Sequence, residues 1–410
     1  MTIPTSSPES SAETSRSGLS LILETFRVFL RLGCTSFGGP VAHLGYFQNE
    51  FVQRHRWLSP AVYADIVALC QFLPGPASSQ VALVLGYRRS GLLGGILGWM
   101  AFTAPSTLLM IGFAYDVHAL NLEQARWLAG LKVAAVAVVA QAIWTMAIRL
   151  CPDFVRILFM AASAAALIFF HATWLQPVVI AAGLLLGLAF LQDKTVSHHD
   201  EKLFPENRLL SGRLAAANLA LFALLLAICL FWHDGGQLEN LFARFYRTGA
   251  LVFGGGHVVL PLLQAETVRS GLVSHDVFLA GYGAAQALPG PLFTFASFLG
   301  ASVSSPYPRW LVGLWCLAAI LLPSLLLILG TLPFWARLID NVHARAALKG
   351  ANATVVGLLL AAFYDPVWKG GITSPQTGIL ALTAFALLQF WKIPNWAIVL
   401  LCAAAGECLL

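Results

Sequence analysis

The sequence predicts an all-α integral membrane protein of about thirteen transmembrane helices in two inverted-topology repeats. Hydrophobic residues make up 58% of its 410 residues and charged residues 10%, whereas soluble domains carry about 25% charged residues. The tetrapeptide Leu-Pro-Gly-Pro occurs twice, at 73–76 and 288–291, each time inside an apolar run. A proline-glycine-proline unit stops a helix because it removes two backbone donors, so we expect helices to break at both copies.

The chain is internally duplicated well beyond this tetrapeptide. Arg31 and Arg247 lie 216 positions apart, as do Glu50 and Glu266, and further matched pairs keep nearly the same offset. This period is far too long for a solenoid. It is typical of a transporter built from two similar halves.

The expected helices follow from apolar stretches that approach the roughly 20 residues needed for a crossing. They run over 19–37, 62–86, 91–113, 129–149, 155–172, 175–191, 214–233, 241–253, 276–300, 310–331, 350–364, 375–391 and 394–410. Two of them, 241–253 and 350–364, are short enough to be half-helices. The segments 38–60 and 254–275 are either loops or re-entrant hairpins.

The loop charges give the expected orientation. With a cytoplasmic N-terminus and one crossing per stretch, most Lys and Arg residues fall in cytoplasmic loops, as the positive-inside rule requires. Arg54 and Arg56 are the main exceptions. Six crossings per half and one extra helix at 214–233 make the second half begin on the opposite side. The repeats are therefore expected to be inverted, with a periplasmic C-terminus.

Four regions are expected along the chain. They are a disordered cytoplasmic tail (1–18), a first transporter repeat (19–191), a polar linker with an extra helix (192–238) and a second, inverted repeat (239–410). The tail lacks an apolar core and is not a signal peptide. The scattered cysteines and the histidine pair in the linker indicate no metal site or cofactor. The net charge of +5 resides on loops and does not indicate nucleic acid binding.

The two breaks are the first candidate binding site. Broken backbone survives at membrane depth only when it is buried in protein or faces water. The residues after each break suit the first turn of a new half-helix, whose free amides and positive dipole end favour an anion. A hinge without a ligand is the alternative, but two copies in inverted halves favour binding. The candidates are Pro74, Gly75, Pro76 and Ser78, with Pro289, Gly290, Pro291 and Thr294.

A Phe-Gly-Gly signature precedes each break. Its glycines, Gly38 and Gly39 with Gly254 and Gly255, allow close backbone approach to a substrate, or else serve as packing points between helices. His43 and His257 follow these signatures but do not align under the 216 offset. Each histidine is a candidate for coupling, with a structural hydrogen bond as the alternative.

Charged and amide side chains complete the candidate set. Arg31 and Arg247 lie inside apolar segments and need a partner, which is either a glutamate or an anionic substrate. Glu50 and Glu266 are the acidic residues kept in register, either as ion-pair partners or as protonatable coupling sites. Further candidates are the amides Gln71 and Gln286 and the secondary cations Lys132 and Lys349, which otherwise serve as interhelical contacts and snorkelling anchors.

The electrostatics favour a small divalent oxyanion. Two helix N-termini contribute about half a positive charge each. Two arginines add two more, so an apolar cavity would accept a tetrahedral dianion and reject a cation.

These motifs resemble those of the chromate ion transporter family, of its long-chain, two-domain type. The resemblance rests on 37–40 with His43, on 71–76, on 253–257 and on 285–291, in that order, and it covers both halves. It implies antiparallel halves and chromate efflux from the bacterial cytoplasm across the inner membrane, driven by the proton gradient or the membrane potential. Sulfate is the structural analogue that the resemblance implies.

Other functions stay open at this stage. A sulfate or other oxyanion carrier and a passive anion channel would share this architecture. An enzyme is not expected, since the spans hold no paired aspartates, zinc-ligand cluster or nucleophile elbow. The expected partners are chromate or sulfate, protons as a coupling ion, and the lipid bilayer, while association as a homodimer stays open.

Overall fold

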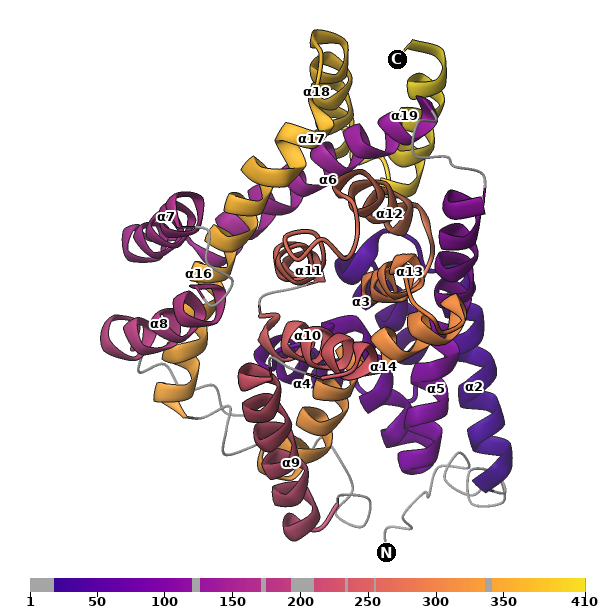
Figure 1. Ribbon diagram of the computed structural model, residues 1–410. Coiled ribbons are helices and arrows are strands. Elements are labelled where there is room, and N and C mark those ends of the chain that lie inside the picture. The colour runs from indigo at the N-terminus through magenta and orange to yellow at the C-terminus, as the bar shows by residue number, and fades with distance from the viewer. Residues whose placement is uncertain are drawn as a thin grey trace, which may run out of the picture.

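The computed structural model describes residues 18–119, 126–170, 175–192, 210–232, 235–253, 256–335 and 341–409, and every regular element among them is a helix (Figure 1). The first half contains α2 (Gly18–Thr35), α3 (Gly39–Phe47), the π-helix η1 (Gln48–Arg54), α4 (Pro60–Phe72), α5 (Ala77–Ala119), α6 (Arg126–Leu150), α7 (Phe154–Phe169) and α8 (Leu175–Phe190). One further helix, α9 (Gly212–Phe231), separates the halves.

The second half repeats this order of helices. It contains α10 (Gln237–Leu251), η4 (Gly256–Val258), α11 (Val259–Thr267), α12 (His275–Ala287), η5 (Leu292–Thr294), α13 (Phe295–Ser302), α14 (Arg309–Thr331), η6 (Leu332–Phe334), α16 (Val342–Ala362), η7 (Phe363–Trp368), α17 (Lys369–Gly371), α18 (Pro375–Gln389) and α19 (Asn395–Leu409). Each predicted apolar stretch therefore coincides with a helix or a pair of helices.

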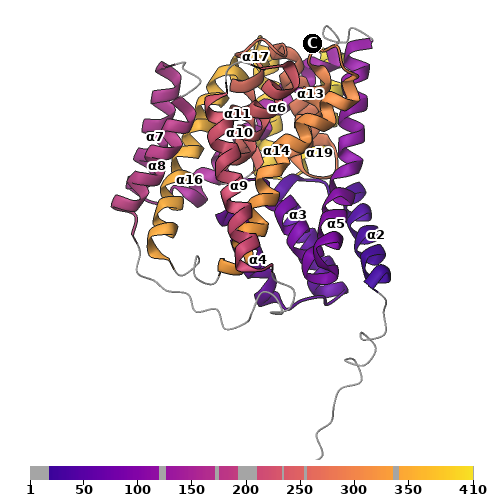
Figure 2. The same ribbon diagram turned by 60° about the horizontal axis from the view of Figure 1, so that its bottom comes forward.

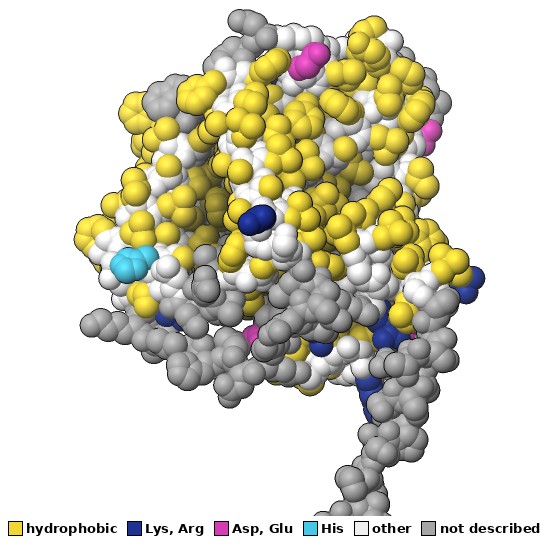
Figure 3. Space-filling model, turned by 90° about the horizontal axis from the view of Figure 1, so that it is seen from below, with side chains coloured by type: hydrophobic (Ala, Val, Ile, Leu, Met, Phe, Trp, Pro, Cys, Tyr) yellow, Lys and Arg dark blue, Asp and Glu magenta, His cyan; other side chains and the backbone are white. Residues whose placement is uncertain are grey.

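The helices suit a bilayer. Five helices in the described ranges are long and apolar enough to cross one, and several shorter apolar helices accompany them. The five are Ala77–Val117, Arg126–Leu150, Gly212–Phe231, Arg309–Phe334 and Val342–Gly371. Hydrophobic side chains cover most of the described part of the face shown in Figure 3, and most of the few Lys and Arg side chains visible there lie in its lower half. The chain is a multi-pass membrane protein. The predicted count of about thirteen crossings includes the stretch 62–86, which the structure does not bear out as a crossing.

The long helix α5 reverses direction inside its length. Ser90 and Gly91 leave the helical region, and Gly91 has φ +80°. A methyl group added to Gly86 would lie 3.0 Å from the carbonyl oxygen of Gly94, although residues eight apart in a straight helix are separated by about 12 Å. Segments 77–89 and 92–119 are therefore antiparallel neighbours.

Helix α4 and segment 77–89 form a re-entrant hairpin. The guanidinium carbon of Arg89 lies 5.1 Å from the ring centroid of Trp57, so the chain starts and finishes this excursion at the same end. Glu24, near the start of α2, also pairs with Arg89 at 3.5 Å. The expectation that 62–86 crosses once is thus wrong, because this stretch returns to the end where it began. Arg54, three residues before Trp57 along the chain, also lies near this end.

The second half repeats the reversal between α13 and α14. Methyl groups added to Gly300 and Gly313 would each lie 2.7 Å from a carbonyl oxygen of the other helix, that of Val312 and that of Ser297. The start of α10 lies beside this turn, since the side-chain amide of Gln237 donates to the carbonyl of Ser304 at 2.7 Å. In Figure 2, α3 and α4 lie toward one end of the molecule and α11 and α13 toward the other.

The two halves exchange their outer helices. Helix α6 of the first half packs against α18 and α19 of the second, while α16 of the second half packs against α7 and α8 of the first. Glycines make these contacts close: a side chain at Gly130 would overlap the Cys402 backbone, and one at Gly187 would overlap that of Ala346.

Candidate functional site

Each Leu-Pro-Gly-Pro break is bound by the backbone of the other half. Gly75 donates its N–H to the carbonyl of Val252 at 2.7 Å, and Gly290 donates to the carbonyl of Ser36 at 2.9 Å. Ser36 and Val252 are themselves equivalent, being 216 positions apart. Both glycines have positive φ, +122° and +98°, a conformation that other residues adopt at a cost. The predicted helix breaks are confirmed, since α4 ends at Phe72 and α5 begins after Pro76.

The breaks lie at the middle of the two long spanning helices. Gly75 contacts Ser324, near the midpoint of α14, so closely that a side chain at Gly75 would overlap its hydroxyl. A methyl group at Gly290 would lie 2.7 Å from Oγ of Ser106, at the midpoint of 92–119. Neither serine was predicted as a site residue. Their equivalence is visible in the sequence, because Pro105-Ser106 and Pro323-Ser324 match at an offset of 218.

The Phe-Gly-Gly signatures reach the same region. Gly38 and Gly39 both have positive φ, and they lie at the N-cap and the first position of α3. A methyl group on Gly256, which opens η4, would lie 2.8 Å from Cγ of Pro40, so the two signatures touch. Gly254 and Gly255 lie outside the described residues.

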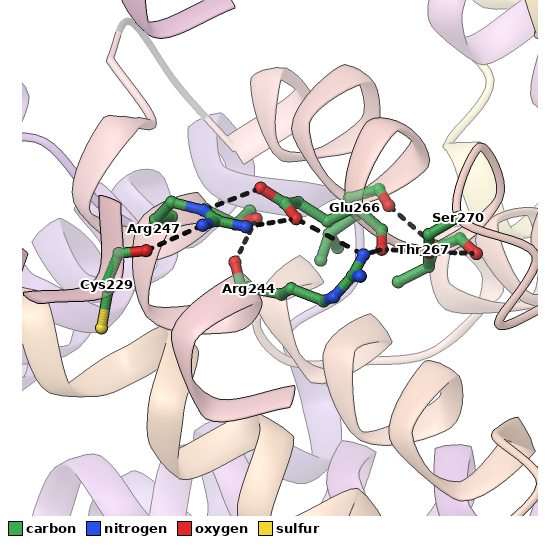
Figure 4. Close-up of polar contacts among 8 residues, drawn as sticks. Cys229, Arg244, Arg247, Glu266, Thr267 and Ser270 are labelled. Carbon is green, nitrogen blue, oxygen red and sulfur yellow. Dashed lines mark hydrogen bonds and ion pairs between the residues drawn. The ribbon is translucent and has the colours of Figure 1, made fainter. Parts of the chain in front are cut away.

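Arg247 of α10 forms an ion pair with Glu266 of α11 (Figure 4). Its Nε and NH2 atoms donate to the two carboxylate oxygens of Glu266 at 3.0 and 2.8 Å, and NH1 donates to the carbonyl of Cys229 at 2.7 Å. Arg244 also approaches Glu266, at 3.8 Å. The guanidinium thus has a protein acceptor for each nitrogen and links α10 to α9 and α11.

The equivalent pair in the first half joins Arg31 of α2 to Glu50 of η1. Glu50 is buried and also accepts from His55 at 2.8 Å and pairs with Arg54 at 3.5 Å. Each carboxylate therefore faces at least two cationic side chains, so each ion-pair cluster carries an excess of positive charge. The glutamate alternative is what the structure shows for both arginines, and direct contact with an anion stays a prediction.

The two candidate histidines have different surroundings. His43 is fully buried and donates from Nε2 to the carbonyl of Ser36 at 3.1 Å, the same oxygen that Gly290 bonds. Nδ1 of His257 lies 3.0 Å from the hydroxyl of Tyr282. Both histidines therefore make the hydrogen bonds that the structural alternative predicted. A coupling role for either one stays a prediction.

The remaining candidates divide between the site and the periphery. Ser78 and Thr294 are buried in the first turns after the breaks. Gln286 lies two residues before the second break, and its Oε1 accepts from Asn395 at 3.4 Å. By contrast, Oε1 of Gln71 accepts a hydrogen bond from Arg149 at an exposed position, and Lys132 pairs with Asp276 at 2.7 Å. Lys349 lies on α16, where its side chain also has an interaction partner.

Several buried polar atoms around the breaks have no hydrogen-bond partner. They are Oγ of Ser36, Nδ1 of His43, Oγ of Ser79, Oε1 of Gln80 and Nε2 of Gln286. Unpaired buried polar atoms are costly and point to a ligand or a water at the place where they occur. Sequence analysis did not select Gln80, whose role depends on how its side chain folds back over the break.

Comparison with known proteins agrees with this architecture. The sequence profile described as "Chromate transporter" matches residues 23–188 and 239–407. The chain is 28% identical over 393 residues to the "Chromate transport protein" of Pseudomonas aeruginosa, covering 93% of this chain and 90% of that protein. It is 27% identical to the "Probable chromate transport protein" of Synechococcus elongatus, covering 92% and 93%.

A third relative, the "Chromate transport protein" of Cupriavidus metallidurans, is 27% identical over 371 residues, covering 89% of this chain and 87% of that protein. No solved structure matches the chain. Because the profile spans most of both halves, the chain belongs to the chromate transporter family.

Proposed function

We propose that the protein is a secondary active transporter that exports chromate from the bacterial cytoplasm, confers chromate resistance, and passes the oxyanion between its two breaks. Three relatives named as chromate transport proteins support the substrate. The observation that carries the pathway is the reciprocal pair of bonds, Gly75 to Val252 and Gly290 to Ser36, at the middle of the spanning helices.

The halves are proposed to be inverted repeats. Reciprocal contacts between equivalent residues are what a two-fold axis between two similar units produces. In Figure 2, α3 and α4 of the first half lie toward one end of the molecule, and α11 and α13 of the second half lie toward the other, which supports an axis in the membrane plane. Transporters of this kind bind substrate near the midplane at the interface between the repeats.

The proposed orientation puts the N-terminus in the cytoplasm and the C-terminus in the periplasm. The hairpin formed by α4 and 77–89 brings Arg54 and Arg89 to one end, and the positive-inside rule assigns that end to the cytoplasm. With this orientation, Arg54 and Arg56 also satisfy the positive-inside rule, to which they were the main exceptions. This agreement supports an inner-membrane location for the protein.

The amides and cations near the breaks suit the passage of an anion. The first N–H groups of 77–89 have no intrahelical acceptor and lie at the positive end of the helix dipole. Arg31 and Arg247 add positive charge one to two turns from the breaks, along α2 and α10. We propose that Glu50 and Glu266 couple transport by releasing their arginines on protonation, with the proton gradient or the membrane potential as the energy source.

Radiolabelled chromate uptake into everted membrane vesicles tests the proposal. The vesicles should accumulate chromate in an energised state, excess sulfate should measure the overlap between the two anions, and an uncoupler should abolish accumulation. Accumulation of sulfate but not chromate would identify a sulfate carrier. Equilibration without accumulation would identify a passive channel.

A further inference from the structure

The first break carries a hydrogen-bond acceptor that no protein group satisfies. The side chain of Gln80 folds back over the break, where Nε2 donates to the carbonyl of Pro74 at 2.7 Å and to Oγ of Ser324 at 3.3 Å. A carbonyl can only accept, so these contacts fix Nε2 at Pro74 and leave Oε1 as the end of the amide without a partner. Oε1 is buried and has no partner, and Gln80 is 1% exposed.

Donors surround the same place. The first backbone bond of the helix is made by the N–H of Gln80 to the carbonyl of Pro76 at 2.9 Å, so the amides of residues 77–79 precede the intrahelical ladder. Oγ of Ser79 is also buried without a partner, and side chains in a helix lean toward its N-terminus. The first break thus presents several donors and one acceptor.

The second break lacks this arrangement. At the 215 offset that aligns the two tetrapeptides, Ser79 and Gln80 correspond to Thr294 and Phe295. The Thr294 hydroxyl donates to the carbonyl of Pro291 at 2.9 Å, and the first turn closes on itself as a 3₁₀ helix. The two ends are therefore not equivalent in their capacity to bind an anion.

We propose that the first break binds the oxyanion in its singly protonated form, with the acid hydroxyl donating to Oε1 of Gln80. The other oxygens accept from the amides of 77–79 and from the hydroxyl of Ser79. This inference rests on the proposed transport of chromate and names the species carried. A buried acceptor left unpaired costs free energy, so a ligand that supplies a hydroxyl is favoured over one that cannot.

Protonation then distinguishes chromate from sulfate. Chromate takes up a proton close to neutral pH to give hydrogen chromate, whereas sulfate stays fully ionised until strongly acidic pH. Sulfate at the first break would leave Oε1 of Gln80 unpaired and facing an oxyanion oxygen. Each hydrogen chromate would also carry one proton with it and move as a monoanion.

Equilibrium dialysis of the purified full-length protein in nanodiscs, with radiolabelled chromate, tests this inference. Measured one pH unit below and one above the second pKa of free chromate, wild-type affinity should be about tenfold higher at the lower pH. Gln80→Met, which removes the acceptor, should lose this pH dependence and weaken binding at the lower pH by about tenfold or more. Ser79→Ala should weaken binding at both pH values and keep their ratio.

A matched control comes from Gln176. This glutamine is also buried and donates from Nε2 to a proline carbonyl, that of Pro261 at 3.3 Å, but lies on α8. Gln176→Met should keep the wild-type pH dependence. The elements next to Gln80 carry further titratable groups, namely Tyr63, Asp65 and Cys70 of α4, Tyr87, Arg88 and Arg89 of segment 77–89, Arg309 and Cys316 of α14, and Glu239, Arg244, Tyr246 and Arg247 of α10.

The outcomes separate this inference from the proposed function. A pH dependence that persists in Gln80→Met would assign it to one of these other groups and overturn the inference. Equal affinity for chromate at both pH values, or sulfate binding as tight as chromate at the lower pH, would overturn it as well. In either case chromate uptake by vesicles would still support transport. Absence of both binding and uptake would overturn the two together.

Discussion

The backbone N–H of Gly75 donates to the carbonyl oxygen of Val252 at 2.7 Å, across the boundary between the two halves of the chain. The equivalent bond, from Gly290 to Ser36, runs in the opposite sense at 2.9 Å. Each break is therefore completed by the residue that precedes the glycine signature of the other half. Neither half holds a complete site alone.

Substitution of either break glycine should destabilise the protein. In Gly290→Ala the new methyl group would meet Oγ of Ser106 at 2.7 Å, and alanine would be held at φ +98°. Strain of this kind costs about 1–3 kcal/mol. Thermal unfolding in detergent should show a lower Tm, while Gly112→Ala, with no atom near the added carbon, should match wild type. An unchanged Tm for Gly290→Ala would contradict the packing described.

Arg247→Gln should abolish chromate extrusion while the protein stays in the membrane. The substitution leaves the partly buried Glu266 without its bidentate partner and removes the positive charge that we propose attracts the oxyanion. Arg31→Gln should act in the same way through Glu50. Growth on chromate and immunoblots of membrane fractions measure the two effects, and full resistance in either variant would exclude the role.

The double variant Arg247→Met with Glu266→Met separates the ion pair from contact with the oxyanion. Removal of both charges should restore most of the thermal stability, because no carboxylate is left unpaired and Arg244 keeps its hydrogen bond to the backbone carbonyl of residue 266. Transport should not recover if the arginine also attracts the substrate. Recovery of both properties would show that Arg247 serves the ion pair alone.

Gln53 and Ser304 should be accessible from opposite sides of the membrane. Both are exposed, the first before the α4 hairpin and the second in the turn between α13 and α14. In a variant without the exposed cysteines Cys34 and Cys408, a membrane-impermeant thiol reagent should label Gln53→Cys in everted vesicles and Ser304→Cys in intact cells. Labelling of both from the same side would contradict opposed hairpins.

Cleavage between the halves should leave them associated. A protease site inserted within 193–209 would separate α2–α8 from α9–α19, yet α6 packs against α18 and α19 while α16 packs against α7 and α8. After cleavage in detergent, an affinity tag on one fragment should retain the other in stoichiometric amount. Separation of the fragments without denaturant would rule out this exchange of helices.

The sequence predicted the helices and the duplication well because both depend on local signals. Apolar runs mark the longer helices, and the break at 73–76 follows from proline and glycine chemistry. Helices α3 and α11 and the π-helix η1 lie instead in the segments 38–60 and 254–275, for which loops or re-entrant hairpins were predicted. The in-register offset of Arg31 and Glu50 with Arg247 and Glu266 already named the two ion pairs as one of two alternatives. Each pair joins residues 19 positions apart, on α2 and η1 in the first half and on α10 and α11 in the second.

Other features depend on contacts that no local pattern encodes. The contacts of Arg89 with Trp57 and Glu24 show that 62–86 returns to its starting end, whereas a crossing segment would have the same composition. The acceptor role of Val252 and the position of Gln80 over the break arise from packing between residues far apart in the chain. His43 and His257, which do not align, proved to have different partners.

Chromate uptake into energised everted vesicles, compared between wild type and the variants Gly75→Leu and Gly290→Leu at matched protein amounts, tests most directly whether the two breaks form the pathway. We expect accumulation by wild type and none by either variant, because a leucine at either position displaces the partner serine, Ser324 or Ser106, at the point where the halves meet. Wild-type uptake by either variant in the folded state would contradict the account.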